Sequence, residues 1–142
     1  MSSDLKFRPL TDADVSAVVA LWRECGLTRP QNMPEKDIAF ARGKPNSDIL
    51  VGVIDGTVVA SIMVGHDGHR GSFYYVAVDP RHRRNGIGAS LIRAGEQWLK
   101  DRGVWKVNLL IRQENADVQG FYERLGYSVN EVMSMGQRIL DD

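Results

Sequence analysis

The sequence has a single cysteine, no net charge and no long apolar run, and each shortage excludes a class of protein. Cys25 alone cannot form an intramolecular disulfide or a thiolate metal site, which fits a reducing compartment. The 18 basic residues balance the 18 acidic residues, so no overall positive field favours nucleic acid as a partner. Neither a signal-peptide pattern nor an apolar run of about eighteen residues occurs, so we expect a cytoplasmic protein without membrane contact.

What is present is the composition of an ordinary folded domain. The chain has 142 residues, of which 43% are hydrophobic and 25% are charged, and this excludes disordered and fibrous proteins. A chain of this length buries roughly 68–70% of its unfolded surface. We therefore expect one soluble domain over residues 1–142.

Hydrophobic spacing and turn residues predict the order of the helices and strands. In chain order we expect a strand over 5–9, a helix capped by Thr11 and ended by Gly26, a short helix over 35–42 in a proline-containing rim, strands over 49–54, 57–64 and 72–78, a helix over 86–101, a strand over 104–111, a helix from Asn115 to Gly126, and strands over 127–132 and 134–139. Trp22, Trp98 and Trp105 are expected to be core or interface residues, and Cys25 a buried helix residue. The order predicts a mixed α/β sheet with helices on both faces.

The segment from Val76 to Ser90 is a strand that enters a basic turn and continues directly into a helix. Gly86 and Gly88 have no side chains to keep a ligand from the backbone, and the first amides of a helix bind anions. Arg83 and Arg84 would add charge. A P-loop is absent, and Leu91 stands where the dinucleotide fingerprint needs its third glycine. A plain surface turn with solvated arginines is the alternative.

This turn resembles the Arg/Gln-x-x-Gly-x-Gly/Ala signature of the GNAT N-acetyltransferases, with the residues Arg83-Arg84-Asn85-Gly86-Ile87-Gly88. The preceding strand, Val76 to Pro80, is similar to the fourth strand of that family. A late motif of Asn115, Tyr122 and Leu125-Gly126-Tyr127 also matches, and the turn at Asp67–Gly71 is similar to the small bacterial YpeA-like branch. The resemblance covers nearly the whole chain.

The resemblance implies the GNAT acyl-CoA N-acyltransferase fold, a mostly antiparallel sheet splayed between its fourth and fifth strands. It implies acetyl-CoA as the acetyl donor and no metal. The backbone at Val76 and Val78 would hold the pantetheine arm, and Asn115 would orient the cofactor. The pyrophosphate would contact the turn and helix start, with the residues Arg83, Arg84, Asn85, Gly86, Ile87, Gly88, Ala89 and Ser90.

Tyr122 is, by the same resemblance, the catalytic acid for the leaving thiolate. A phenol of pKa about 10 is a weaker acid than a thiol of about 8.5, so Tyr122 would act through a hydrogen bond or a site-lowered pKa. Several members of the family have a glutamate on the fourth strand, but this chain has Phe73, Tyr74 and Tyr75 there. The base is therefore open between a water relay, a rim carboxylate such as Glu24 or Glu35, and an acceptor that arrives neutral.

The resemblance implies transfer of acetyl to a primary amine, of a small molecule or a protein, by direct attack in a ternary complex. A CoA-binding sensor that transfers nothing is one alternative, and a different phosphate-ligand binder is another. His66, Asp67 and His69 fit a hairpin turn better than a metal site, with an acceptor pocket as a further interpretation. The tail strands are compatible with a homodimer.

Overall fold

The computed structural model describes residues 4–83 and 85–140 of the chain. The chain folds into two compact units, Met1–Leu109 and Leu110–Asp142. The single domain expected over residues 1–142 stays a prediction. None of the helices in the described residues is long and apolar enough to cross a membrane.

The first unit is built on an antiparallel sheet in the order β1-β2-β3-β4. The strands are β1 (Leu5–Pro9), β2 (Ser47–Ile54), β3 (Thr57–His66) and β4 (Gly71–Val78). Asp55 and Gly56 both have positive φ, 49° and 77°, as the tight turn between β2 and β3 requires. Gly68 has φ 88° in the turn between β3 and β4. The predicted meander of three strands is confirmed.

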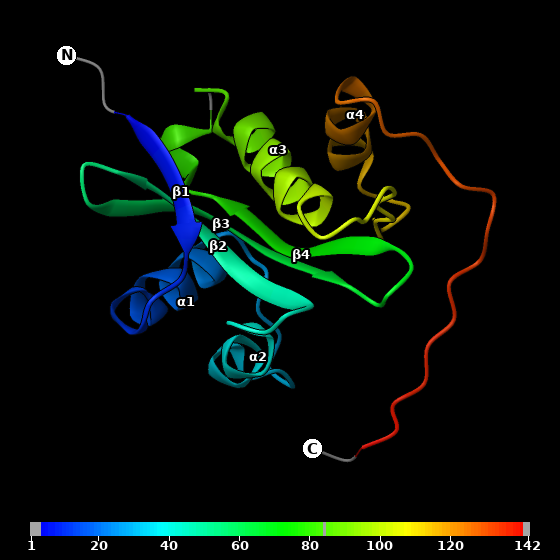
Figure 1. Cartoon of the computed structure of the whole chain (residues 1–142), viewed down its shortest axis with the longest axis horizontal. Coiled ribbons are helices and arrows are strands. Elements are labelled where there is room, and N and C mark those ends of the chain that lie inside the picture. The colour runs from blue at the N-terminus through cyan, green and yellow to red at the C-terminus, as the bar shows by residue number, and fades with distance from the viewer. Residues whose placement is uncertain (1–3, 84, 141–142) are drawn as a thin grey trace. The chain divides into compact units, whose positions relative to one another are not determined.

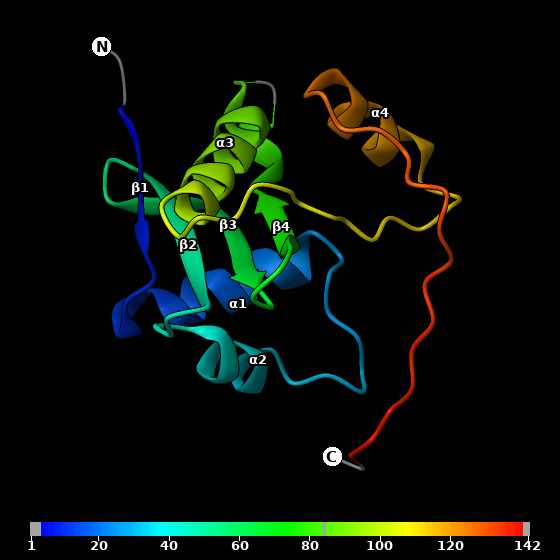
Figure 2. The ribbon, with the colours of Figure 1, turned by 45° about the vertical axis from the view of Figure 1, so that its right-hand side comes forward.

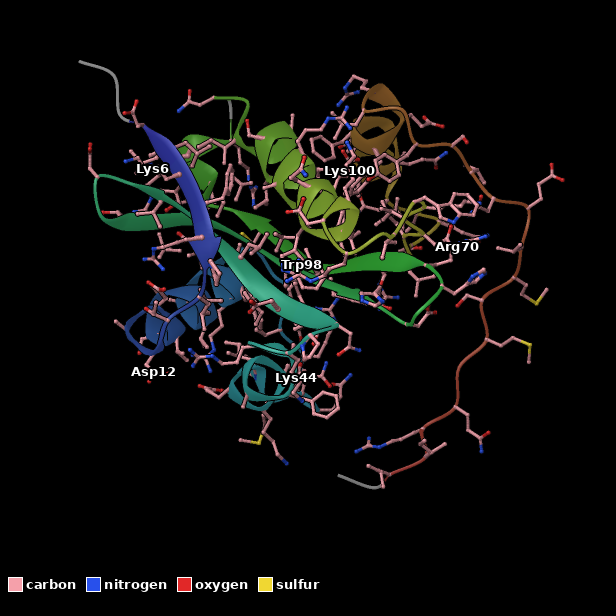
Figure 3. The ribbon with its side chains drawn as sticks, viewed as in Figure 1. Lys6, Asp12, Lys44, Arg70, Trp98 and Lys100 are labelled. Atoms are coloured by element: carbon pink, nitrogen blue, oxygen red, sulfur yellow. The ribbon has the colours of Figure 1, made fainter. Side chains whose placement is uncertain are left out.

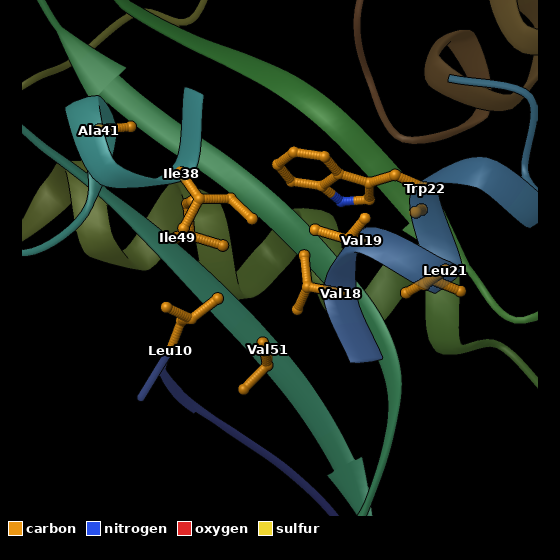
Figure 4. Packing of buried hydrophobic residues seen from close by; sticks show 10 residues of the cluster. Leu10, Val18, Val19, Leu21, Trp22, Ile38, Ala41, Ile49 and Val51 are labelled. Carbon is orange, nitrogen blue, oxygen red and sulfur yellow. The ribbon is translucent and has the colours of Figure 1, made fainter. Parts of the chain in front are cut away.

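Two helices, α1 (Val15–Glu24) and α2 (Pro34–Ala41), cover one face of this sheet (Figures 1 and 2). Their buried side chains pack on β2 and β3 around Trp22 and Ile38 (Figure 4). Trp22 is fully buried, and its ring nitrogen donates a hydrogen bond of 2.8 Å to the equally buried Ser61 hydroxyl. Because the two groups hydrogen-bond to each other, this bond offsets the free-energy cost of removing them from water.

The helix α3 (Ile87–Lys100) covers the opposite face (Figures 1 and 2). The helix lies close to the sheet because Gly95, which has no side chain, faces the strands. A Cβ atom at this position would lie 2.8 Å from the Phe73 ring and 3.0 Å from Ile62. The mixed α/β architecture with helices on both faces is thus confirmed.

The three tryptophans divide between the core and the surface. Trp22 and Trp98 are buried, as predicted, and the Arg102 guanidinium lies 3.5 Å from the centre of the Trp98 ring. Trp105 is 75% exposed, so it is not a core residue, and the interface alternative stays a prediction. The Arg70 guanidinium stacks 4.3 Å from the centre of the Trp105 ring and covers one of its faces (Figure 3 labels Arg70 and Trp98).

The start of α1 is fixed by a charged cap. The Asp14 carboxylate accepts hydrogen bonds from the Thr11 backbone amide at 2.8 Å and from the Arg8 guanidinium at 2.6 Å. Asp14 ends a short 3₁₀ turn, Asp12–Asp14, that leads into the helix. The predicted C-terminal ends of two helices are also confirmed. Gly26 follows α1 with φ 72°, and Gly103 follows α3 with φ 84°.

The strand expected over 104–111 is wrong. This segment pairs with β4 at one parallel bridge, Gly71 with Val107, where the Gly71 amide donates to Lys106 and the Asn108 amide donates to Gly71, each at 2.9 Å. No second pair follows among the described residues, so no ladder forms. A β-propensity pattern becomes a strand only where a partner strand continues the hydrogen bonds. Within the described residues of the first unit, Gly71 is thus the one residue of β4 that pairs with this segment.

The second unit contains the helix α4 (Ala116–Arg124) and a tail without secondary structure. The helix and its stop at Gly126, with φ 101°, are confirmed. The strands expected over 127–132 and 134–139 are wrong, because nothing among the described residues pairs with them. Apolar tail side chains such as Val132 and Met135 are 81% and 88% exposed. Homodimerisation through the tail stays a prediction.

Candidate functional site

The end of β4 contains Val76 and Val78, two of the residues expected to bind the cofactor. The pairing of β3 with β4 shifts register, since Met63 faces Tyr74 whereas Ser61 faces Ala77, which leaves one extra residue in β4. Asp79 donates its amide to Val59 in β3 at 2.8 Å, so the preceding Val78 points its amide and carbonyl away from β3. Val76 lies two residues before Val78, at the register shift itself. An extended ligand can therefore pair with the outer edge of β4 at Val78.

This edge leads into the turn that the sequence singled out. A 3₁₀ turn, Pro80–His82, is followed by Gly86, whose left-handed φ of 72° makes it the N-cap of α3. The first helical hydrogen bond runs from the Ser90 amide to the Gly86 carbonyl at 3.2 Å. The amides of Ile87, Gly88 and Ala89 therefore have no partner within the helix and carry the positive end of its dipole. The turn can bind an anion through its backbone.

Two arginine side chains of the turn, those of Arg81 and Arg83, bind groups of the protein itself. Arg81 pairs with Asp79 at 2.9 Å and lies 3.8 Å from Glu24, and its guanidinium lowers the pKa of the Asp79 carboxyl. Arg83 turns back and donates from Nε to the Val78 carbonyl at 3.2 Å. Arg84 lies outside the described residues. Asn85 is exposed in the turn, and Ser90 lies at the end of the first turn of α3.

A second polar cluster, formed by Tyr75 and Asp37, lies on the side of the sheet that α1 and α2 cover. It was not predicted from the sequence. Tyr75 has φ 51°, a left-handed conformation uncommon outside glycine, at the extra residue of the strand. Its ring stacks on Trp22 with centroids 3.8 Å apart, and its hydroxyl donates to the Asp37 carboxylate of α2 at 2.6 Å. Burial and the neighbouring Asp37 raise the pKa of Tyr75 to about 12. Asp37 is thus the carboxylate that α2 brings to the fourth strand, in addition to the rim carboxylates Glu24 and Glu35 considered from the sequence.

In the second unit, Asn115 and Tyr122 share the helix α4. Asn115 is its N-cap, and the side-chain oxygen accepts a bond of 3.4 Å from the Val118 amide, which leaves the side-chain NH₂ available as a donor. The Tyr122 ring packs edge-on against Phe121 and Tyr127 at 5.1 and 5.5 Å between centroids. Asn115 is therefore a helix cap whichever further role it has.

Tyr122 is 7% exposed, and burial raises its pKa to about 12. Its hydroxyl has no hydrogen-bond partner among the described residues. The apolar surroundings disfavour the phenolate, so they do not favour a site-lowered pKa, which is one of the two alternatives considered for Tyr122. Of the two catalytic modes derived from the sequence, hydrogen-bond donation by the neutral phenol is the one that this environment favours.

The hairpin at residues 66–70 uses its polar side chains for the turn itself. The Asp67 carboxylate accepts from the amides of His69 and Arg70 at 2.8 Å each, and these bonds lower its pKa. His66 Nδ1 accepts from the Gly68 amide at 3.0 Å. Within the described part of the chain, no group of three or more His, Cys, Asp or Glu residues could hold a metal. The structure supports the turn interpretation.

A comparison with protein families now places the chain. Residues 15–127 match the model of the acetyltransferase (GNAT) family, so the chain belongs to this family. The matched region includes the β4 edge, the turn before α3 and the whole of α4. The protein is accordingly an acetyl-CoA-dependent N-acetyltransferase.

Solved structures of several acetyltransferases share the fold. The aminoglycoside N-acetyltransferase AAC(6')-Iy in complex with CoA has a TM-score of 0.84 at 15% identity, over 97% of both chains. An aminoglycoside acetyltransferase from an uncultured soil metagenomic sample, bound to sisomicin, has a TM-score of 0.78 at 18% identity, over 96% of this chain and 97% of the other. An acetyltransferase of Trypanosoma brucei has a TM-score of 0.74 at 25% identity, over 95% and 100%.

Proposed function

We propose that this enzyme transfers the acetyl group of acetyl-CoA to a primary amine by direct attack within a ternary complex. The observation that carries the proposal is the outer edge of β4, where the Val78 backbone faces away from β3 and the strand runs directly into the Gly86 turn and the free amides of α3. The strand edge suits the amide groups of the pantetheine arm. The helix start suits the pyrophosphate, because both its N–H groups and its dipole favour negative charge.

Arg83 and Arg84 complete this donor site in the proposal. Arg83 lies on the Val78 carbonyl, so it must exchange that bond for the cofactor when the pantetheine arm pairs with β4. A guanidinium bound to phosphate gains charge-assisted hydrogen bonds, which are roughly twice as strong as neutral ones. The exchange is therefore favourable for the bound complex.

Tyr122 stabilises the leaving thiolate in the proposed reaction. With a pKa of about 12 it is a much weaker acid than a thiol of about 8.5. A proton transfer to the thiolate is then uphill, whereas a hydrogen bond strengthens as negative charge develops on sulfur. Asn115 orients the cofactor through the NH₂ group that its capping bond leaves available.

The similar aminoglycoside acetyltransferases raise the question of whether an aminoglycoside is the acceptor here. At 15% and 18% identity these likenesses show the fold alone. They do not identify the acceptor of this enzyme. The acceptor is either an amine of a protein or a small-molecule amine.

Binding and turnover measured together test the proposal. We expect acetyl-CoA to bind more tightly than ADP in a calorimetric titration, because ADP lacks the pantetheine arm that pairs with β4. We also expect amines to accelerate thiol release from acetyl-CoA. Equal affinity for both ligands would favour another phosphate-ligand binder. Acetyl-CoA binding without amine-dependent thiol release, over a broad panel, would favour a sensor.

A further inference from the structure

A shallow hollow of about 490 Å³ lies in the first unit between the end of α1 and the start of α2. Its lining consists of Arg23, Thr28, Arg29, Pro30, Asn32 and Pro34. Two of these residues are arginines, two are other hydrogen-bonding residues, and none is acidic. The donor site described above does not use any of them.

The arginines give the hollow a positive charge. Arg29 is held in place by one guanidinium nitrogen, Nη1, which donates to the carbonyls of Gly26 and Thr28 at 3.0 Å each. Its other N–H groups have no partner among the described residues, and neither has the guanidinium of Arg23. Pro30 and Pro34 restrict the surrounding backbone. A planar guanidinium fixed in this way matches a carboxylate, to which it can donate two parallel hydrogen bonds.

The hollow adjoins the polar cluster on β4. Arg29 interacts electrostatically with the Tyr75 hydroxyl, which donates to Asp37 at 2.6 Å. Pro34 in the lining and Asp37 are three residues apart in α2, so they lie on the same side of the helix. A positive hollow therefore stands beside one carboxylate, and that carboxylate is held at the fourth strand.

We propose that the acceptor is a small amine that also carries a carboxylate, as an amino acid does, with its carboxylate on Arg29 and its amino group directed toward Asp37. Arg23 adds positive charge, and Thr28 and Asn32 add hydrogen bonds. This inference rests on the proposed acetyl transfer and names the substrate class for it. A polycation such as an aminoglycoside is disfavoured, because it would bring positive charge to two arginines.

Acetyl-CoA and the acceptor account for every bond and every proton of the reaction. The ammonium form of the acceptor loses a proton, and the amine lone pair attacks the thioester carbonyl carbon. A C–N bond forms and the C–S bond breaks, and the amine gives up its second proton as the thiolate is protonated. The products are the N-acetyl amino acid, CoA as the thiol and one proton released to solvent. Asp37 holds the ammonium group near β4 before the first proton leaves.

Matched pairs of acceptors test the inference. Thiol release from acetyl-CoA is measured with a panel of amino acids, each beside the amine that lacks its carboxylate, at equal concentrations of the neutral amine base. Sisomicin is included as the polycation. We expect the best amino acid to have a kcat/KM at least about tenfold above that of its decarboxylated partner, since charge-assisted hydrogen bonds are lost with the carboxylate.

A variant locates the effect in the hollow. Arg29→Gln should raise KM for the amino acid about tenfold and leave kcat/KM for the decarboxylated amine nearly unchanged. Lys6→Gln removes the same charge from the exposed side of β1 and serves as the control. Equal or faster transfer to sisomicin or to decarboxylated amines would overturn the inference and leave the proposed function standing. Binding of acetyl-CoA with no transfer to any amine would overturn both.

Discussion

The Nε group of Arg83 donates a hydrogen bond to the carbonyl oxygen of Val78 at 3.2 Å, and the Cys25 thiol lies 3.4 Å from the same oxygen. Arg83 Nη2 is also 3.4 Å from the Cys25 sulfur. The end of the fourth strand, the end of the first helix and the basic turn therefore meet at one backbone carbonyl. A ligand that pairs with the Val78 carbonyl competes with Arg83 and Cys25 for this oxygen.

This contact predicts that acetyl-CoA changes the reactivity of Cys25. The thiol is half-buried and is the single cysteine of the chain, so alkylation reports on this position alone. We expect saturating acetyl-CoA to slow alkylation by iodoacetamide about tenfold or more, because the pantetheine arm covers Val78. ADP should protect much less. An alkylation rate that acetyl-CoA leaves unchanged would contradict the assignment of the β4 edge.

The ion pair between Arg8 and Asp14 predicts a pH-dependent contribution to stability. Hydrogen bonds from Arg8, the largest effect, and from Thr11 lower the pKa of Asp14 to about 2. Because the folded-state pKa lies below the unfolded value of about 3.9, the contribution is present above about pH 4 and is lost as the pH falls through about 2. Asp14→Asn should cost about 1–2 kcal/mol at pH 7, and this cost should decrease below about pH 4 and disappear only below about pH 2.

Asp12→Asn is the matched control for this prediction. Asp12 pairs with Arg42 at the same distance of 2.6 Å, but its side chain is 96% exposed, whereas that of Asp14 is 8% exposed. Exposed pairs contribute roughly 0–1 kcal/mol. Urea unfolding of the three proteins over the pH range provides the comparison, and equal losses for the two variants would show that burial of Asp14 is irrelevant.

Gly95 sets the distance between α3 and the sheet, which predicts a large loss on adding one methyl group. Gly95→Ala would place a carbon 2.8 Å from the Phe73 ring, so it should destabilise the fold by about 1–3 kcal/mol. Gly120→Ala in α4 meets only the end of Arg124 at 3.4 Å and should gain up to about 1 kcal/mol from helix propensity. Urea midpoints measure both changes. A neutral Gly95→Ala would mean that the helix can move away from the sheet without cost.

The pKa of Tyr122, raised to about 12, predicts the alkaline behaviour of the enzyme. Because the shift is upward, the phenol stays protonated through about pH 10, where an ordinary tyrosine is half ionised. kcat should therefore not fall between about pH 8 and pH 10 through loss of the Tyr122 proton. The kcat profile of the wild type tests this, and a descending limb near pH 9 that disappears in Tyr122→Phe would contradict it.

The sequence predicted the sheet core, the helices and the turn before α3 because these depend on local signals. Glycine at positions with positive φ, such as Gly86, marks a turn wherever the chain folds. The strands expected over 104–111, 127–132 and 134–139 failed because apolar alternation describes what a strand prefers and not whether a partner reaches it. The exposed Trp105 shows the same limit, since its partner Arg70 lies in the turn between β3 and β4 and is distant from it in the sequence.

The candidate site was predictable where it is contiguous in sequence and not where it depends on folding. Val76 to Ser90 form one uninterrupted strand, turn and helix, so the motif carries its own geometry. Asp37 and Tyr75 are 38 residues apart and meet because α2 and β4 both pack against α1. The bulge that gives Tyr75 its positive φ has no glycine to announce it. No pattern in the sequence pairs these two residues.

The measurement that tests the account most directly is the acetylation rate of Tyr122→Phe with saturating acetyl-CoA and an amino acid acceptor. Tyr127→Phe, which removes the hydroxyl from the ring packed against Tyr122 at 5.5 Å, is the control. The account predicts that kcat falls about tenfold or more in Tyr122→Phe, which corresponds to roughly 1.4 kcal/mol of lost transition-state stabilisation. It predicts a smaller change in Tyr127→Phe. A Tyr122→Phe enzyme that transfers acetyl as fast as the wild type would contradict the role of this residue.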